Sequence, residues 1–403
     1  MQHNRRDILL DVTRLVSRSW TGRQSTGIDR VCYAYLRHYR DRSLAVIQHR
    51  GVVRVLGPRR SETLFRMLLG PSKGFRAKFT AWAPAALFGV SQPRGLHGLT
   101  YINVSHTDFD LPEHFDWVRV NKLRSIYFVH DLIPVRCPQL SRPHAVARHT
   151  GRVRSALCNA DQIIVASQTV ADDLSAYANA ENLPAPPIAV SHISGERFSP
   201  IKHSAKQSPF FLCVGTIEPR KNHRLLLDVW NKLTSDMGRS APQLLIVGQP
   251  GPRTGEILAA AASQPNIEFL GHCSDEELAV LMNDCTALLM PSQAEGFGLP
   301  VVEALELGTN VIASDSAIFR EITQGMAQLI DPVDVDAWSH AIARLAREHR
   351  SGAWNGAAKT ERAKRFSPPT WDAHFAKVDR AILAHSAAAT LKSDAACESS
   401  LAA

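Results

Sequence analysis

Residues 286–308, TALLMPSQAEGFGLPVVEALELG, decide the fold because they lead from an apolar strand through a glycine loop into a short helix. Pro300 fixes the backbone at the expected first helical position, and Gly308 supplies a stop about two turns later. The segment places Glu295 on the loop and Glu303 in the helix, eight positions apart. A strand, a loop and a helix in this order are the repeating unit of α/β proteins.

Glu303 stands among apolar residues, so its carboxylate is expected to be partly buried and must find hydrogen-bond donors. A ribose diol supplies two donors, and the pair of carboxylates therefore suits a nucleotide-sugar site. Gly296 and Gly298 allow the backbone to approach a ligand, and free amides at the helix start can face an anion. An ordinary turn with solvated acids is the alternative that this segment leaves open.

The composition is that of a soluble globular protein, with 403 residues, 45% hydrophobic and 21% charged, which suffices for two domains. The 7 cysteines contain no CxxC pair, so neither a disulfide framework nor a zinc ribbon is expected, and a reducing cytoplasm fits best. The amino-terminal apolar run is too short for a signal peptide, and no stretch approaches the roughly 20 apolar residues of a membrane span.

The net positive charge is concentrated in the amino-terminal half. Residues 1–200 carry 27 Lys+Arg against 15 Asp+Glu, whereas the remainder carries 19 against 23. Basic and apolar side chains alternate in residues 54–82, a combination that suits an anionic membrane surface or an anionic lipid-linked acceptor. A solvated basic face explains the pattern equally well, and no nucleic-acid motif accompanies the charge. The basic residues are Arg54, Arg59, Arg60, Arg66, Lys73, Arg76 and Lys78.

Short apolar runs alternate with helical patterns along both halves, which predicts parallel sheets of the doubly wound type. The expected strands are residues 8–12, 44–48, 100–104, 125–129, 162–166, 188–193, 210–214, 243–247, 267–270, 286–290, 310–313 and 327–330. A Pro- and Ser-containing stretch at 198–209 reads as a linker. We therefore expect a first domain over 1–197, a second over 210–367, a helix over 368–385 and a disordered tail over 386–403.

The loop after the expected strand 210–214 carries GTIEPRKN and two adjacent cations, Arg220 and Lys221. Gly215 ends the strand and allows a close backbone approach, and Asn222 can begin the following helix. Two cations at a helix start, where the helix dipole is also positive, make sense if a diphosphate binds there. A solvated basic loop is the alternative.

Together, the segments EGFGLPVVE and GTIEPRKN resemble the retaining glycosyltransferases of family 4, which have the two-domain GT-B fold. The resemblance extends to Asp315 and Glu321, to Gly195, and to the pair His130-Asp131 after an expected strand. It implies an α/β protein with two Rossmann-like domains that face a cleft. It covers most of residues 1–385, and its carboxy-terminal motifs are the more specific ones.

The resemblance implies a role for each matching position. Glu303 would bind the ribose, Glu295 with the backbone of Phe297 and Gly298 would hold hydroxyls of the transferred sugar, and Arg220 and Lys221 would neutralise the departing diphosphate. His130 would reach the sugar near the reacting carbon. Thr216 stands where many relatives carry arginine, so either Arg220 carries more of the interaction with the phosphates or the affinity for the donor is weaker. The further expected substrate-binding residues are Gly215, Thr216, Leu299 and Gly27.

No metal or cofactor is expected besides the nucleotide-sugar donor. The acids Asp108 with Asp110 and Asp334 with Asp336 have the spacing of a metal-binding motif, but such pairs are common on loops. His106 follows a strand, where it could line the cleft, but a structural role is favoured. Gly27 lies between the first strand and first helix, where plain turn chemistry explains it as well as ligand contact.

The sequence thus predicts a cytoplasmic hexosyltransferase, peripheral at the inner face of the membrane, that acts on a lipid-linked saccharide or growing polysaccharide. The GTIEPRKN and HDLIP segments look most like bacterial mannosyltransferases of exopolysaccharide and O-antigen assembly, which makes GDP-mannose the first donor expected. UDP-glucose and UDP-galactose remain open, as does a non-catalytic carbohydrate- or nucleotide-binding protein that kept the fold. A Rossmann oxidoreductase requires a GxGxxG turn that the chain lacks.

Overall fold

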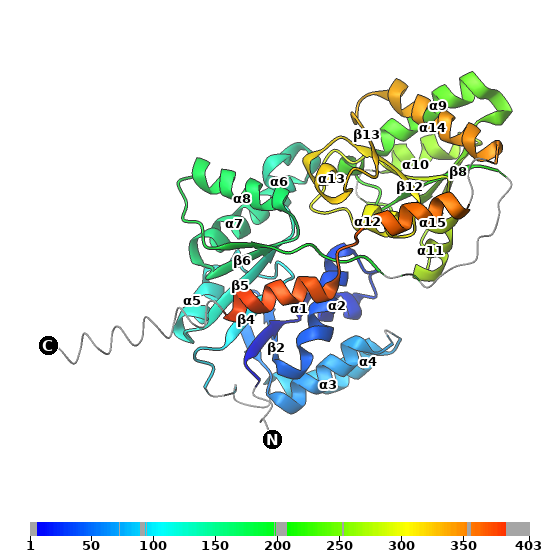
Figure 1. Ribbon diagram of the computed structural model, residues 1–403. Helices are drawn as coiled ribbons and strands as arrows, with labels where there is room; N and C mark the ends of the chain where they lie inside the picture. The colour runs from blue at the N-terminus through cyan, green and yellow to red at the C-terminus, as the bar shows by residue number, and fades with distance from the viewer. Residues whose placement is uncertain are drawn as a thin grey trace. The chain divides into compact units, whose positions relative to one another are not determined.

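The computed structural model describes residues 6–71, 73–88, 93, 95–196, 198, 208–251, 254–352 and 356–383. The chain divides into two compact units, one formed by Met1–Ile193 with Trp371–Ala403 and the other by Ser194–Thr370. Each unit holds one sheet with helices packed around it (Figure 1). The unit changes at Ser194, four residues before the expected linker 198–209, and most of that linker lies outside the described residues.

The amino-terminal unit contains a seven-stranded sheet in the order β3-β2-β1-β4-β5-β6-β7. Its neighbouring strands are parallel except for the antiparallel pair β2 and β3. Strand order reverses between β1 and β4, which makes this pair the topological switch point of the sheet. The strands are β1 (Ile8–Asp11), β2 (Ser43–His49), β3 (Val52–Val55), β4 (Thr100–Asn103), β5 (Arg124–Val129), β6 (Gln162–Val165) and β7 (Ile188–Val190).

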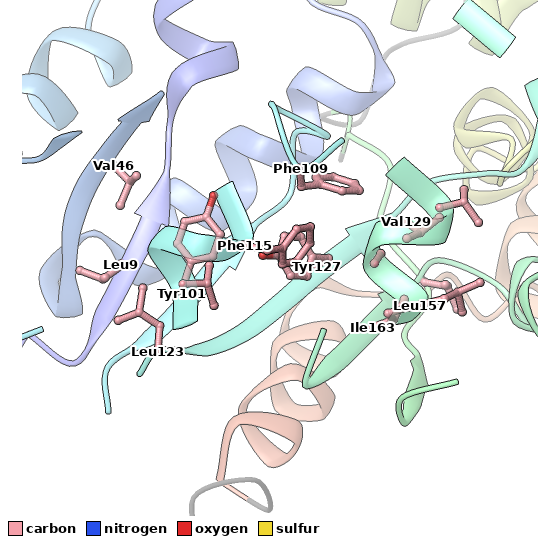
Figure 2. Packing of buried hydrophobic residues seen from close by; sticks show 14 of the residues in the cluster. Leu9, Val46, Tyr101, Phe109, Phe115, Leu123, Tyr127, Val129, Leu157 and Ile163 are labelled. Atoms are coloured by element: carbon pink, nitrogen blue, oxygen red, sulfur yellow. The ribbon is translucent and has the colours of Figure 1, made fainter. Parts of the chain in front are cut away.

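Helices cover this sheet and bury an aromatic-rich core. Figure 2 shows side chains from neighbouring strands gathering around the rings of Tyr101, Phe115 and Tyr127. The helices are α1 (Thr13–Thr21), α2 (Gly27–Tyr39), α3 (Pro58–Leu69), α4 (Phe75–Ala83), α5 (Pro112–Val120), α6 (Ile133–Arg136), α7 (Pro143–Asn159) and α8 (Gln168–Ala180), with the short helical turns η1 (Arg40–Arg42), η2 (Pro84–Phe88) and η3 (Pro138–Leu140).

The last described helix, residues 371–383, belongs to the amino-terminal unit although it follows the carboxy-terminal one. His374 is 1% exposed, and its Nε2 lies 2.9 Å from the hydroxyl of Tyr35. The Tyr39 hydroxyl donates to Asp379 at 3.0 Å. The sequence placed this helix at 368–385 as a separate element; it begins at Trp371, after two prolines, and the expected disordered tail lies outside the described residues.

The carboxy-terminal unit contains a six-stranded parallel sheet in the order β10-β9-β8-β11-β12-β13. Helices α9 and α14 lie side by side on one face, and α11, α12 and α15 cover the other (Figure 1). The strands are β8 (Phe210–Val214), β9 (Gln243–Val247), β10 (Ile267–Gly271), β11 (Ala287–Met290), β12 (Asn310–Ser314) and β13 (Gln328–Ile330). The helices are η4 (Pro219–Lys221), α9 (His223–Met237), η5 (Gly238–Ser240), α10 (Gly255–Ala262), α11 (Asp275–Asp284), α12 (Leu299–Glu306), α13 (Ala317–Ile322), α14 (Val335–Arg350) and α15 (Gly356–Arg365).

Sequence reasoning missed β3 and the helices that follow it. Strand β3 pairs with β2 through a tight turn at Arg50 and Gly51, whose φ angles of 50° and 83° fit a hairpin of the type I′ class. Of the apolar side chains expected to accompany the basic residues at a membrane, several are instead buried in the core: Leu64, Phe65, Leu68, Phe75 and Phe79. The exposed side chains of α3 and α4 are therefore more basic than apolar, although Met67, Leu69 and Trp82 stay partly exposed. No helix among the described residues is long and apolar enough to cross a membrane.

Candidate active site

The loops after β8 and β11 meet at the switch point of the carboxy-terminal sheet, where ligands of doubly wound folds bind. Strands β8 and β11 are parallel neighbours, so their carboxyl ends lie at the same edge. The backbone N–H of Gln293 donates to the carbonyl of Arg220 at 2.8 Å, which joins the two loops. The side chain of Arg220 also donates to the carbonyl of Ala294 at 3.1 Å.

Four charged side chains from these loops form one connected group, which we call the charge cluster: Glu218, Arg220, Lys221 and Glu295. One oxygen of Glu295 accepts a hydrogen bond from Arg220 Nη1 at 2.7 Å, and the other forms an ion pair with Lys221 Nζ at 2.5 Å. The carboxylate of Glu218 forms an ion pair with Arg220 Nη2 at 2.7 Å. The structure thus brings together three residues that the sequence singled out separately, and adds Glu218.

Burial makes the interactions of Glu295 strong. Its side chain is 7% exposed and that of Lys221 is 10% exposed. Burial alone would raise the pKa of Glu295, but Arg220 and Lys221 more than offset it and lower that pKa to about 2. The carboxylate is therefore ionised throughout the physiological range, and a fixed pair of cations stands at the edge of the sheet.

Two glycines at the strand ends near the charge cluster lack a Cβ that would collide with neighbouring atoms, so the chain segments there can approach one another closely. Gly215 has φ +144°, and a Cβ there would lie 3.2 Å from Lys221 Cε. Gly248, after β9, has φ +157°, and a Cβ there would lie 1.9 Å from the carbonyl oxygen of Gly215. Thr216 follows Gly215 and is half-buried. The two expected binding positions Gly215 and Thr216 thus lie in the loop that carries the cations.

Helix α12 places Glu303 in a second buried position of the same unit. The helix begins at Leu299, one residue before the expected start, so Glu303 is its fifth residue. Glu303 is 1% exposed, and its Oε1 accepts the backbone N–H of Glu196 at 3.0 Å. A Cβ on Gly195 would lie 2.4 Å from Glu303 Cγ, so the chain passes directly over this carboxylate only because residue 195 is glycine.

The glycine loop before α12 is tightly packed. Gly298 has φ +106°, a left-handed conformation that favours glycine, and a Cβ there would lie 3.0 Å from the ring of Phe319. Phe297 is 5% exposed and Leu299 8% exposed. Their side chains serve packing, so a ligand would meet the backbone of this loop rather than those side chains.

In the amino-terminal unit, His130 follows β5 and is 8% exposed. Its Nε2 lies 2.7 Å from the carbonyl oxygen of Val104, and because a carbonyl only accepts, Nε2 carries the hydrogen. Burial lowers the pKa of His130 to about 4. The neutral ring therefore offers Nδ1 as a hydrogen-bond acceptor.

His106 supports the turn that holds His130. The backbone N–H of His130 donates to His106 Nε2 at 3.2 Å, and the two ring centroids lie 5.0 Å apart. His149 donates from Nε2 to the carbonyl of Asp131 at 2.9 Å, and Asp131 in turn accepts the N–H of Ile133. The expected structural role of His106 agrees with these contacts.

Gly27 is the first residue of α2 and does not precede the first helix, as the sequence suggested, because α1 already occupies Thr13–Thr21. Asp29 in the first turn accepts from the backbone N–H of Thr26 at 2.7 Å and pairs with Arg14 at 2.5 Å and Arg18 at 3.2 Å. This start of the helix is therefore already held by internal contacts, and ligand binding at Gly27 stays a prediction.

The acidic pairs with metal-binding spacing have other partners. Asp108 and Asp110 pair with Arg148, and Asp110 also pairs with Arg152. Asp334 accepts the N–H of Ala337 at the start of α14, and Asp336 pairs with Lys232. Within the described residues, no group of three His, Cys, Asp or Glu side chains is arranged to hold a metal ion.

Two glycosyltransferase structures share this fold over nearly the whole chain. Sucrose-phosphate synthase from Thermosynechococcus elongatus matches with a TM-score of 0.62 at 20% identity, covering 96% of this chain and 100% of that one. An α,α-trehalose-phosphate synthase from Burkholderia xenovorans matches with a TM-score of 0.57 at 14% identity, covering 93% and 99%. The fold is thus GT-B, as the sequence predicted.

Residues 195–361 match the family of glycosyl transferases group 1, so the chain carries a domain of that family. Sequence relatives include the serotype-specific mannosyltransferase WbdA of Escherichia coli, 30% identical over 55% of this chain and 29% of WbdA. The O-antigen chain mannosyltransferase RfbU of Salmonella typhimurium is 28% identical over 54% of this chain and 59% of RfbU. The match spans less than a third of WbdA. The region that matches the family, residues 195–361, includes the charge cluster, Glu303 and Gly195.

Proposed function

We propose that the protein is a retaining hexosyltransferase that uses a nucleotide diphosphate sugar. The observation that carries this proposal is the pair Arg220 and Lys221, held on the buried carboxylate of Glu295 at the switch point of the sheet. Ligands of such folds bind at that place, and two fixed cations there suit a diphosphate.

The cations would act on the leaving group. When the anomeric C–O bond breaks, positive charge builds on the sugar and negative charge on the diphosphate. Because Arg220 and Lys221 are already held in place, they stabilise that negative charge without reorganising, an effect worth several kcal/mol of barrier, on the order of 3 kcal/mol for one donor. The acceptor oxygen then bonds to the anomeric carbon from the same face, and its proton passes to an oxygen of the departing phosphate.

The carboxylates would hold the donor. We assign Glu303 to the ribose hydroxyls and Glu295, with the backbone N–H groups of Phe297 and Gly298, to hydroxyls of the sugar. Each oxygen of an ionised carboxylate accepts two hydrogen bonds, so Glu295 can bind hydroxyls while it holds both cations. His130 would accept a sugar hydroxyl at Nδ1, the nitrogen left without a hydrogen when Nε2 bonds Val104.

Mannose from GDP-mannose is the donor we propose first. The motif GTIEPRKN and the relatives named as mannosyltransferases both support it. UDP-glucose and UDP-galactose are the alternatives, because sugar choice depends on a few hydroxyl contacts. The acceptor we propose is a lipid-linked or growing polysaccharide, and metal is not required in this account because the cations take its place on the diphosphate.

A peripheral position at the inner face of the cell membrane is part of the proposal. Exposed cations on α3, α4 and the turn between them support it: Arg59, Arg66, Lys73, Arg76 and Lys78. Each such residue near an anionic surface contributes about 1 kcal/mol. Since the apolar side chains of α3 and α4 are largely in the core, the attraction would be electrostatic and would weaken as salt is raised.

A panel of nucleotide sugars tests the proposal by thermal shift and turnover. A donor at 100 times its dissociation constant adds about 2.7 kcal/mol to the free energy of unfolding, enough for a clear shift. We expect GDP-mannose to give the largest shift and to transfer mannose with its anomeric configuration retained, as seen by NMR of the product. Binding without turnover of any donor would favour a non-catalytic protein instead.

A further inference from the structure

Glu218 is the member of the charge cluster to which neither the sequence nor the family match assigns a role. It precedes the turn η4, and its carbonyl oxygen accepts the N–H of Lys221 at 3.0 Å. Pro219 follows and restricts the backbone. The turn thereby fixes where the Glu218 side chain begins, and its carboxylate reaches Arg220 Nη2 at 2.7 Å.

The two carboxylates on Arg220 differ in how freely they can leave it. Glu295 is 7% exposed and is also held by Lys221, so its removal would leave two cations without their buried partner. Glu218 is 27% exposed, and within the described part of the chain Arg220 is the cation that pairs with it. Its carboxylate can therefore turn into water at small cost, as is usual for a partly exposed ion pair.

The cluster also has no surplus charge, since two acids balance two cations. A diphosphate that entered would meet Arg220 with Nη1 already on Glu295 and Nη2 on Glu218. A carboxylate is the group most similar to a phosphate in charge and geometry. The diphosphate and Glu218 would compete for the same donor.

We propose that Glu218 is a displaceable internal carboxylate that occupies the phosphate position on Arg220 in the empty site and yields to the diphosphate of the donor. It is a positioning residue: it keeps the arginine fork oriented when no ligand is bound and lowers the affinity for the donor and for the nucleoside diphosphate product. The inference rests on the proposed function of the charge cluster.

Titration calorimetry with GDP tests the inference on the full chain. Glu218→Gln keeps the size of the side chain but removes its charge, and we expect GDP to bind about fivefold more tightly, which is about 1 kcal/mol. Glu348→Gln is the matched control, because Glu348 also pairs with an arginine at 2.7 Å and the substitution removes the same charge. Glu348 lies on α14 beside His349, which contacts Thr286 at the amino-terminal end of β11, whereas the charge cluster lies at the carboxyl ends of the strands. This control should leave GDP affinity unchanged.

A second pair of proteins separates competition from a change of net charge near the site. In an Arg220→Met background, Glu218→Gln should no longer tighten GDP binding, because the contested donor is gone. Should Glu218→Gln fail to fold, Glu218→Asp, which shortens the reach to Arg220, should tighten binding in the same direction. A structural role would predict weaker binding in both variants.

Two results overturn the inference in distinguishable ways. If wild-type protein binds GDP but Glu218→Gln binds it equally or less tightly, Glu218 does not compete, and the proposed function stands. If wild-type protein binds no nucleoside diphosphate, with UDP tested beside GDP, then the proposed function fails and the inference fails with it.

Discussion

Gly195 determines how closely the backbone passes over Glu303, so Gly195→Ala tests the role of that carboxylate. The added Cβ would lie 2.4 Å from Glu303 Cγ, where ordinary contacts are 3.4 Å or longer. Glu303 must therefore move by about 1 Å, and a misplacement of about 1 Å can cost a factor on the order of 100 in activity. Because Glu303 is 1% exposed, overpacking should also lower the free energy of unfolding by about 1–3 kcal/mol.

Titration with GDP, and donor turnover measured well below the unfolding temperature, separate lost binding from lost stability. Gly255→Ala is the matched control in the same unit, because a Cβ at this first residue of α10 meets nothing within 4 Å. It should bind GDP normally. If Gly195→Ala binds GDP and turns over donor as well as Gly255→Ala does, Glu303 does not bind the nucleotide and the reasoning is refuted.

Three further predictions concern the carboxy-terminal unit. The pKa of Glu295, about 2 instead of 4.5, implies roughly 3 kcal/mol of stability that is present above pH 4.5 and is lost as pH falls towards 2; the difference in unfolding free energy between wild type and Glu295→Gln should shrink over that range, and a constant difference contradicts this. Arg220→Lys keeps the charge but loses the fork, and calorimetry should show GDP binding weakened about tenfold, with unchanged affinity as the contrary result. Gly308→Ala, whose Cβ would lie 2.1 Å from the carbonyl of Lys359, should lower the unfolding temperature more than Gly352→Ala, which has a similar φ but open space; equal effects would show that α15 yields freely.

Much of the fold was predictable because it depends on local patterns. Most parallel strands are short apolar runs, and β1, β4, β6, β8 and β11 are buried along their whole length. The twelve expected strands all occur within one or two residues of their predicted limits, apart from the shorter β7. The limits of α12 follow from Pro300 and Gly308, which act through their own backbone restrictions. The sequence also placed both cations and Glu295 at strand ends of one sheet, which is why they could be expected to meet.

What the sequence did not reveal depends on contacts between distant segments. The packing of Gly195 on Glu303 joins positions 108 apart, and the pairing of Tyr35 with His374 joins positions 339 apart. Strand β3 is four residues long and interrupted by Arg54, so its alternation was too short to recognise. The role of Glu218 had a local signal, an acid two residues before Arg220, but its contact with the arginine depends on the turn at Pro219.

The central claim is that the charge cluster drives the departure of a nucleoside diphosphate from a sugar. Release of GDP from GDP-mannose, measured for wild type and Glu295→Ala with UDP-glucose and UDP-galactose as alternative donors, tests it most directly. The account predicts that wild-type protein releases nucleoside diphosphate from one of these donors and that Glu295→Ala releases it at least about 100-fold more slowly, the scale of losing a fixed electrostatic contact in the transition state. Equal release by the two proteins, or no release from any donor by either, would contradict it.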